Sequence, residues 1–246
     1  MTSPSLLTRL GWSRPATPVH GHEVVDVDVG DLDPVRLARW LQPAARRAPV
    51  GLDAARVAAL RQHLAPGDVA LVIGAAEGAE ALELGLAVGP SGAVVALEAD
   101  QGVFPVLAAN GALNRDRLRL FPHHVAVARS DAPPPPHGVE AQPLLPFLEA
   151  RHAGLLGRLR WVSFHFDGLG PSLLEALAPL VAAHRPLLRI SVGRGARRSQ
   201  RQALLGFLGE RGYRVERFHG DGGPRARPLT PANVMRWKRL ELLARP

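Results

Sequence analysis

Residues 70–82 read ALVIGAAEGAEAL: an apolar run breaks into a turn of small residues and then continues as a helix. This order predicts a buried strand that leads into a helix through a glycine turn. Such turns hold a phosphate or a nucleoside in doubly wound domains, but they also occur as plain strand-to-helix connections. An acidic residue often stands two positions before the first glycine, whereas this chain has Val72 there.

Apolar and helical segments alternate from residue 69 to residue 218 around this turn. Strands are predicted at 69–73, 93–100, 117–128, 159–168, 186–193 and 212–218, with a further one at 233–237. Helices are predicted at 78–87, 101–113, from 170 onward and at 199–211. The alternation indicates an α/β fold, a Rossmann-like doubly wound sheet that is mostly parallel. Ligands bind such sheets at the carboxyl ends of the strands.

The first 65 residues are expected to form an extension that packs on a core domain spanning 66–246. Alternating apolar and acidic residues predict a strand at 25–29. Asp33 and Pro34 resemble a helix start, so a helix is expected from there to about Arg47. A second helix is predicted at 53–64 with Asp53 as its cap. The proline-rich segment 130–138 is expected to be irregular.

The charge of the chain is uneven along its length. The formal net charge is +8, yet residues 185–246 hold 15 Arg and Lys against four Asp and Glu. This excess could attract an anionic partner, or it could reflect codon bias and solvated faces. Nucleic acid is not favoured, because the basic residues carry no recognition motif and are not interleaved with aromatic residues. The expected partner is a small-molecule acceptor, sugar-containing or anionic; no pattern indicates an oligomeric state.

Several classes of protein are disfavoured by composition. The chain has no cysteine, which excludes disulfides and thiolate metal sites. No apolar stretch approaches the length of a transmembrane helix, and the first 19 residues lack the apolar region of a signal peptide. A cytoplasmic protein is therefore expected. No third ligand can be placed beside His165 and Asp167, so no metal site is predicted.

Two neighbouring strand ends carry the candidate cofactor site. The first strand is followed by Gly74, Ala75, Ala76, Glu77 and Gly78, and the next strand ends in Glu98, Ala99 and Asp100. A carboxylate in the position of Glu98 can accept hydrogen bonds from both ribose hydroxyls. The same sequence pattern is also given by a surface glutamate that only ends a strand. The turn has Gly-x-x-x-Gly spacing and no cation to meet a pyrophosphate. S-adenosylmethionine therefore fits better than a nicotinamide dinucleotide.

A longer stretch resembles the FkbM family of S-adenosylmethionine-dependent methyltransferases. The resemblance is carried by PGDVALVIGAAEGAEALELGLAVGPSGAVVALEAD (66–100), FPVLAANGALN (104–114), LRLFPHHVAVA (118–128) and VSFHFDGLGPSLLEAL (162–177). It extends through HRPLLRISV and FLGERGYRV, so it covers roughly residues 20–217. It implies the class I methyltransferase fold, an S-adenosylmethionine site at the strand ends, and methylation of a hydroxyl on a sugar or secondary metabolite.

The family pattern is not kept at every polar position. Val72 stands in place of the first-strand aspartate and Ala76 in place of an asparagine; Ser163, His165, Asp167 and Gly170 differ from the later segment. His165 is the expected base, and Asp167 is expected to orient its ring or to contact the acceptor. His123 and His124 could contact the adenine or could be an incidental pair. An inactive methyltransferase-like scaffold and, less well supported, a nucleotide-binding oxidoreductase remain as alternatives.

Overall fold

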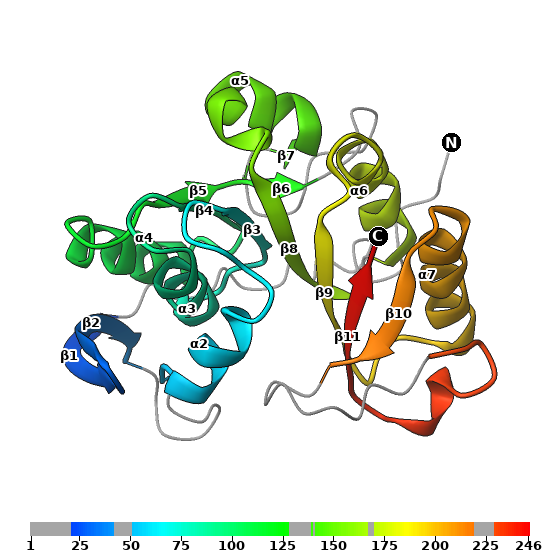
Figure 1. Ribbon diagram of the computed structural model, residues 1–246, viewed down its shortest axis with the longest axis horizontal. Coiled ribbons are helices and arrows are strands. Elements are labelled where there is room, and N and C mark those ends of the chain that lie inside the picture. The colour runs from blue at the N-terminus through cyan, green and yellow to red at the C-terminus, as the bar shows by residue number, and fades with distance from the viewer. Residues whose placement is uncertain (1–20, 42–50, 128–138, 140, 167–169, 219–228) are drawn as a thin grey trace, which may run out of the picture.

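A seven-stranded sheet forms the centre of the protein (Figure 1). The computed structural model describes residues 21–41, 51–127, 139, 141–166, 170–218 and 229–246. The strand order is β10-β11-β9-β8-β3-β4-β5, and all neighbours are parallel except β11, which runs antiparallel to β9 and β10. The predicted doubly wound, mostly parallel sheet is confirmed. Its strands are β3 (Val69–Ile73), β4 (Ala93–Glu98), β5 (Leu120–His124), β8 (Leu159–Phe166), β9 (Leu187–Val192), β10 (Arg214–Arg217) and β11 (Leu240–Arg245).

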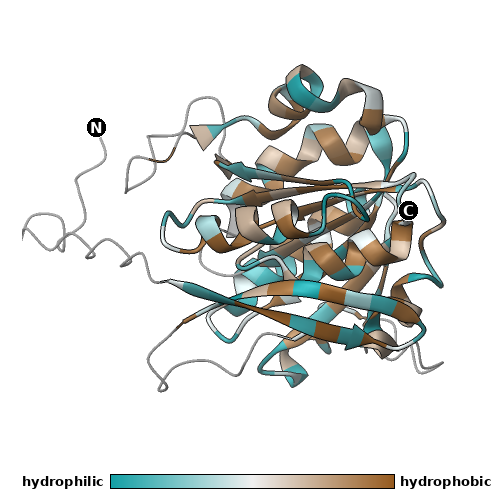
Figure 2. Ribbon diagram, turned by 90° about the vertical axis from the view of Figure 1, so that its left-hand side faces the viewer, coloured by the Kyte–Doolittle hydropathy of each residue, from teal (hydrophilic) through white to brown (hydrophobic). Residues whose placement is uncertain are grey.

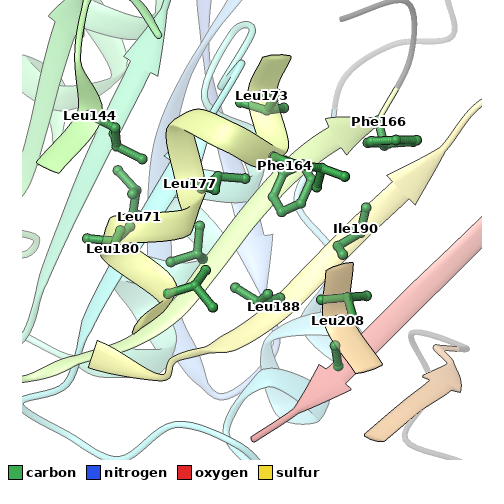
Figure 3. Packing of buried hydrophobic residues seen from close by; sticks show 14 of the residues in the cluster. Leu71, Leu144, Phe164, Phe166, Leu173, Leu177, Leu180, Leu188, Ile190 and Leu208 are labelled. Atoms are coloured by element: carbon green, nitrogen blue, oxygen red, sulfur yellow. The ribbon is translucent and has the colours of Figure 1, made fainter. Parts of the chain in front are cut away.

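Helices cover both faces of the sheet because the central strands bury apolar side chains on both sides. One face packs against α2 (Ala54–Leu60), α3 (Ala79–Val88) and α4 (Phe104–Leu113). The other packs against α5 (Leu144–Leu156), α6 (Gly170–His184) and α7 (Arg198–Glu210). Figure 3 shows this second face, where leucines of α6 lie over Phe164 of β8 and Ile190 of β9. Along β3, alternate residues therefore enter the two different cores.

The segment after Asp33 forms a strand, so the helix predicted from there to Arg47 is wrong over its described part. β1 (His22–Val29) and β2 (Leu32–Trp40) pair as an antiparallel hairpin. Within β2, Val35 and Leu37 are buried while Arg36 is exposed, which is the alternation of a half-buried strand. Figure 2 shows the same alternation along the hairpin. Residues 42–47 lie outside the described residues, as does the proline segment 130–138.

Asn110 of α4 fastens the hairpin to the core. Its side-chain amide donates to the carbonyl oxygens of Ala38 (3.0 Å) and Glu77 (2.7 Å), and its oxygen accepts from the Ala38 amide (2.7 Å). The side chain is fully buried, so these bonds satisfy polar groups that water does not reach. One residue thus joins β2, α4 and the turn that follows β3.

The C-terminal part contains a second correction. Residues 234–236 form a 3₁₀ helix, η1 (Val234–Arg236), where a strand was predicted, and the final strand is β11. β11 lies between β9 and β10, and its residues from Leu242 to Ala244 are all buried. The region predicted as one strand at 117–128 forms β5 and the short strand β6 (Ala126–Val127), whereas α5 and the short strand β7 (Ala141–Gln142) were not predicted. Asp53 does cap α2, as expected, by accepting from the amide of Ala55.

Candidate functional site

The bend between β3 and α3 is held against the end of β4. The amides of Gly74 and Ala75 both donate to the carbonyl oxygen of Leu97, at 2.8 and 3.0 Å. The backbone then turns through positive φ angles of 75° at Gly74, 49° at Ala76 and 93° at Gly78. Glycine adopts such angles without steric cost, but alanine does not. This backbone path brings the amide of Ala76 toward β4.

Glu98, the last residue of β4, meets that bend. One carboxylate oxygen, Oε2, accepts from the amide of Ala76 at 2.7 Å, and the other, Oε1, accepts from the amide of Asp100 at 2.7 Å. The side chain is 9 % exposed. Each carboxylate oxygen has two lone-pair sites, so both can still accept a hydrogen bond from a ligand. The predicted meeting of the carboxylate with the small-residue turn is therefore present.

A cavity of about 420 Å³ opens beside this pair. Four of the predicted site residues line it, and they come from the ends of three parallel strands: Gly74, Glu98, Ala99 and His165. The rest of the lining is apolar and comprises Ile73, Leu97, Val125, Ala126, Val127 and Leu173. A Cβ built at Gly74 would meet nothing within 4 Å, so the backbone there faces open space.

Five other predicted cofactor residues have structural roles instead of lining the cavity. Ala75 is buried in the core. The buried carboxylate of Glu77 points to the hairpin, where it accepts from the amide of Trp40 at 3.4 Å. Gly78 lies against α4, and Asp100 accepts from the amide of Gly102 at 2.8 Å in the turn that leads into α4. Ala76 contributes its amide to Glu98, as described above.

His123 and His124 point to opposite faces of β5, so the two cannot contact one bound ring together. His123 lies 2.8 Å from His152 of α5, nitrogen to nitrogen, and meets the ring of Phe147 edge-on. Burial, together with the nearby His152 and Arg151, lowers the pKa of His123 to about 4. His124 stacks on the ring of Phe104, with centroids 4.9 Å apart. Neither histidine lines the cavity.

His165 is exposed near the end of β8 and borders the cavity. It is paired in register with Ser191 of β9. Asp167, the expected partner of His165, lies outside the described residues. The apolar lining at Val125, Ala126 and Val127 was missed, although the sequence signal was available: these residues follow the strand-end histidines directly.

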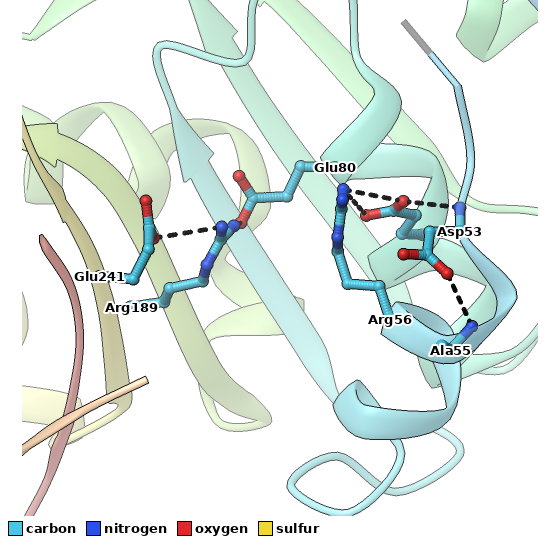
Figure 4. Close-up of polar contacts among 7 residues, drawn as sticks. Asp53, Ala55, Arg56, Glu80, Arg189 and Glu241 are labelled. Carbon is cyan, nitrogen blue, oxygen red and sulfur yellow. Dashed lines mark hydrogen bonds and ion pairs between the residues drawn. The ribbon is translucent and has the colours of Figure 1, made fainter. Parts of the chain in front are cut away.

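An ion-pair network lies on the α3 face of the sheet, one strand away from His165 (Figure 4). The guanidinium of Arg189 in β9 contacts Glu80 of α3 at 2.6 Å and Glu241 of β11 at 3.2 Å. Burial alone would lower the pKa of Arg189, but the two carboxylates outweigh it and raise the pKa. Ser191 donates to Glu241 at 2.7 Å. The network joins α3 to the two strands beyond β8.

The described residues contain neither a group of side chains suited to a metal ion nor a helix suited to spanning a membrane. No cluster of three or more His, Asp or Glu side chains suited to a metal ion occurs in the ranges that the structure describes. Within those same ranges, no helix is both long and apolar enough to cross a membrane.

Solved structures with a similar fold include S-adenosylmethionine-dependent methyltransferases. FkbM methyltransferase from Methylobacillus flagellatus KT matches with a TM-score of 0.53 at 15% identity, over 73% of this chain and 44% of that one. Precorrin-6y C5,15-methyltransferase from Geobacter metallireducens GS-15 matches with a TM-score of 0.45 at 15% identity, over 78% and 86%. Fibrillarin from Aeropyrum pernix, crystallised with S-adenosylmethionine, matches with a TM-score of 0.47 at 14% identity, over 90% and 98%.

These likenesses concern the fold. No protein-family model matches the sequence, and no curated protein matches it. The chain spans less than half the length of the FkbM structure. The sheet and its flanking helices are accordingly those of the Rossmann-like methyltransferase fold.

Proposed function

We propose that this protein is an S-adenosylmethionine-dependent O-methyltransferase. One observation carries the proposal: the Glu98 carboxylate accepts from the Ala76 amide at 2.7 Å at the rim of the 420 Å³ cavity. This geometry joins an acidic strand end to a small-residue bend at the carboxyl edge of a parallel sheet. That edge is where doubly wound folds bind nucleoside ligands.

The residues around the cavity fit an adenosyl group. Glu98 retains acceptor capacity for the ribose hydroxyls, since each oxygen accepts from one protein amide. The open space beside Gly74 leaves its backbone accessible to the amino-acid end of the cofactor. Ala99 and the apolar segment Val125–Val127 offer walls suited to a flat base. When bound, the cofactor supplies a methyl group on a positively charged sulfur.

The role proposed for His165 is to accept the proton of the acceptor hydroxyl. Its side chain is exposed at the cavity, so an acceptor can reach it from solvent. A base near the acceptor contributes about 10²–10⁴-fold in rate, and alignment of the reacting groups contributes about 7–11 kcal/mol in favourable cases. Asp167 would orient the imidazole.

We further propose membership of the FkbM family and, as the sequence resemblance implies, a sugar or secondary-metabolite hydroxyl as the acceptor. The sequence resemblance runs in order over most of the chain, and the FkbM structure shares the fold with a TM-score of 0.53. The bend departs from the FkbM pattern at Ala76, where the family has asparagine. Ala76 adopts a left-handed backbone, a conformation in which asparagine is commoner than alanine.

A second candidate function is that of a binding module which has lost catalysis. Among the described residues that line the cavity, Glu98 and His165 are the ones with an ionisable side chain. Val72, which replaces an expected aspartate, is buried in the apolar core. A chain of this kind would bind the cofactor without transferring its methyl group.

Calorimetric titration with S-adenosylmethionine and S-adenosylhomocysteine tests the cofactor site. The wild-type protein should bind both at micromolar to low millimolar concentrations. Glu98→Ala should weaken binding at least tenfold, because it removes the acceptors for two hydroxyls, whereas Asp116→Asn, at a highly exposed carboxylate, should leave binding unchanged. Absence of binding by the wild-type protein at millimolar ligand would overturn the proposal.

A further inference from the structure

The folded chain brings two basic segments together at the carboxyl end of the parallel strands. The first follows β9 and enters α7; the second runs from Arg236, the last residue of η1, to the start of β11. We call their six exposed cations the basic edge; its members are Arg194, Arg197, Arg198, Arg236, Lys238 and Arg239. In the sequence the two groups are almost forty residues apart.

Buried Arg201 of α7 holds the two segments side by side. Its guanidinium donates to the carbonyl oxygens of Gly193 (3.1 Å) and Val234 (3.0 Å), and also to those of Trp237 (2.7 Å) and Lys238 (3.1 Å). Its Nε donates to the carbonyl of Ala196 at 3.1 Å. Since the side chain is 2 % exposed, Arg201 is itself no part of the charged surface. It fixes the backbone from which the exposed cations project.

The basic edge lies at the same end of the strands as the cavity, the carboxyl end of β8 and β9. β8 and β9 are parallel, and Phe166 pairs with Val192 at their carboxyl ends. β11 is antiparallel, so it begins at this end, with Leu240 opposite Val192. The basic segments therefore start one strand away from His165, which borders the cavity.

The six cations are exposed, so an external anion can reach them. Within the described part of the chain, none of them forms an ion pair with a carboxylate, whereas Arg189 and Arg245 nearby do. No acidic residue occurs at 193–203 or 229–239. Several like charges held together by a fixed backbone produce a local positive potential that attracts anions.

We propose, against the expectation from the sequence, that the basic edge binds the phosphate backbone of a single-stranded nucleic acid, because the fold joins two basic segments that are separate in the chain. Six cations spread over two segments suit a chain of phosphates better than one small anion, and five of them are arginines, whose planar guanidinium matches phosphate geometry. Met235 is the one large apolar side chain exposed among these segments in the described residues. A lipid surface normally needs a broader apolar face.

This surface gives the proposed reaction a candidate acceptor, a link that rests on the proposed function. A ribose in a nucleic-acid strand presents a sugar hydroxyl flanked by phosphates. Phosphates bound along the basic edge would place neighbouring nucleotides toward the cavity. Binding by this surface and methyl transfer in the cavity remain separate properties that separate experiments measure.

Fluorescence anisotropy with labelled 20-nucleotide RNA and DNA strands of mixed sequence tests the proposal. The affected variant is Arg198→Glu/Arg239→Glu. The control is Arg115→Glu/Arg160→Glu, which changes the net charge equally at exposed sites away from the basic edge. At 50 mM salt, we expect the first variant to lose at least tenfold in affinity and the control less than threefold. Phospholipid vesicles with one third anionic lipid serve as the alternative partner.

The salt dependence provides a second measurement. For single strands the slope of log K against log salt is about −0.7 for each phosphate contacted, so six contacts predict roughly −4 and the variant roughly −3. Glu98→Ala should bind the strands normally, which separates this proposal from the cofactor proposal. Equal losses in both double variants, binding to vesicles but to neither strand, or no binding of either strand at 10 µM protein would overturn it.

Discussion

The amide of Ala76 and the carboxylate of Glu98 join the bend after β3 to the end of β4 through one 2.7 Å hydrogen bond. The bond uses a backbone amide of the bend, and Ala76 itself adopts a left-handed backbone with a φ of 49°. The side chain at position 76 is therefore tolerated rather than needed, and the orientation of Glu98 depends on backbone geometry.

Replacing Ala76 by glycine should stabilise the protein. The left-handed conformation costs an L-residue about 1–2 kcal/mol, and glycine removes that cost. Glycine also loses more chain entropy on folding, which opposes the gain by roughly 0.5–1 kcal/mol. A net gain in the free energy of unfolding of up to about 1 kcal/mol is therefore expected. Denaturant unfolding measures the change. Ala75→Gly is the control: Ala75 is buried and has an ordinary φ, so this variant should be destabilised. A loss of stability in Ala76→Gly would contradict the argument.

Substitution of His165 should separate binding from catalysis. His165→Ala should retain S-adenosylmethionine affinity within about threefold and lose about 10²–10⁴-fold in turnover, if this histidine is the base. Methyl transfer to a panel of hydroxyl acceptors provides the rate, and calorimetry provides the affinity. His22→Ala, at an exposed histidine in the hairpin, should change neither. Unchanged turnover in His165→Ala would remove His165 from the mechanism.

The sequence was most informative where burial is complete. β3 and β4 are apolar on both faces, so their short hydrophobic runs identified them, and their spacing placed Glu98 beside the bend. β2 was misread because Asp33 and Pro34 imitate a helix start. Only the pairing with β1 supplies the hydrogen bonds that make the segment a strand.

The faces on which strand-end side chains lie could not be predicted from strand positions alone. His123 and His124 are adjacent in sequence, yet the pleat sends one to α5 and the other to Phe104 of α4. The partner of His123 is His152, on a helix that the sequence pattern does not predict. The basic edge likewise depends on Arg201, whose buried contacts involve segments distant in sequence.

Gly78 should not tolerate a side chain. A Cβ there would lie 2.7 Å from Cδ1 of Leu107, and the φ of 93° is costly for alanine. Gly78→Ala is therefore expected to lose about 2–4 kcal/mol of unfolding free energy. Gly154→Ala provides the matched control: the glycine lies within α5 with nothing near its Cβ position, so a gain of about 0.5–1 kcal/mol is expected. Equal effects of the two substitutions would contradict this account.

Loss of the Asn110 side chain should loosen the hairpin. Asn110→Ala leaves the Ala38 amide and carbonyl and the Glu77 carbonyl without this partner, which should cost about 3 kcal/mol. Denaturant unfolding measures the loss, and hydrogen exchange of β2 amides should rise. Gln62→Ala, at an exposed amide side chain, should be nearly neutral. Unchanged exchange in β2 would show that other contacts hold the hairpin.

The His123–His152 pair should make stability depend on pH. Burial first, and then His152 and Arg151, lower the pKa of His123 from 6.5 to about 4 in the folded protein. Between those values the unfolded chain takes up a proton that the folded protein does not bind, so unfolding becomes more favourable as the pH falls. Below about pH 4 both states are protonated and this contribution changes no further.

Thermal unfolding between pH 7 and pH 4 measures this effect. The melting temperature of the wild-type protein should fall across the interval, and His123→Phe should show a smaller fall because the titrating group is gone while its contact with Phe147 is kept. The melting temperature of His123→Phe should still depend on pH to some extent, since the pKa values of His152 and His63 are also lowered, mainly by burial. His22→Phe should follow the wild-type curve. Parallel curves for the wild type and His123→Phe would show that His123 does not titrate in this range.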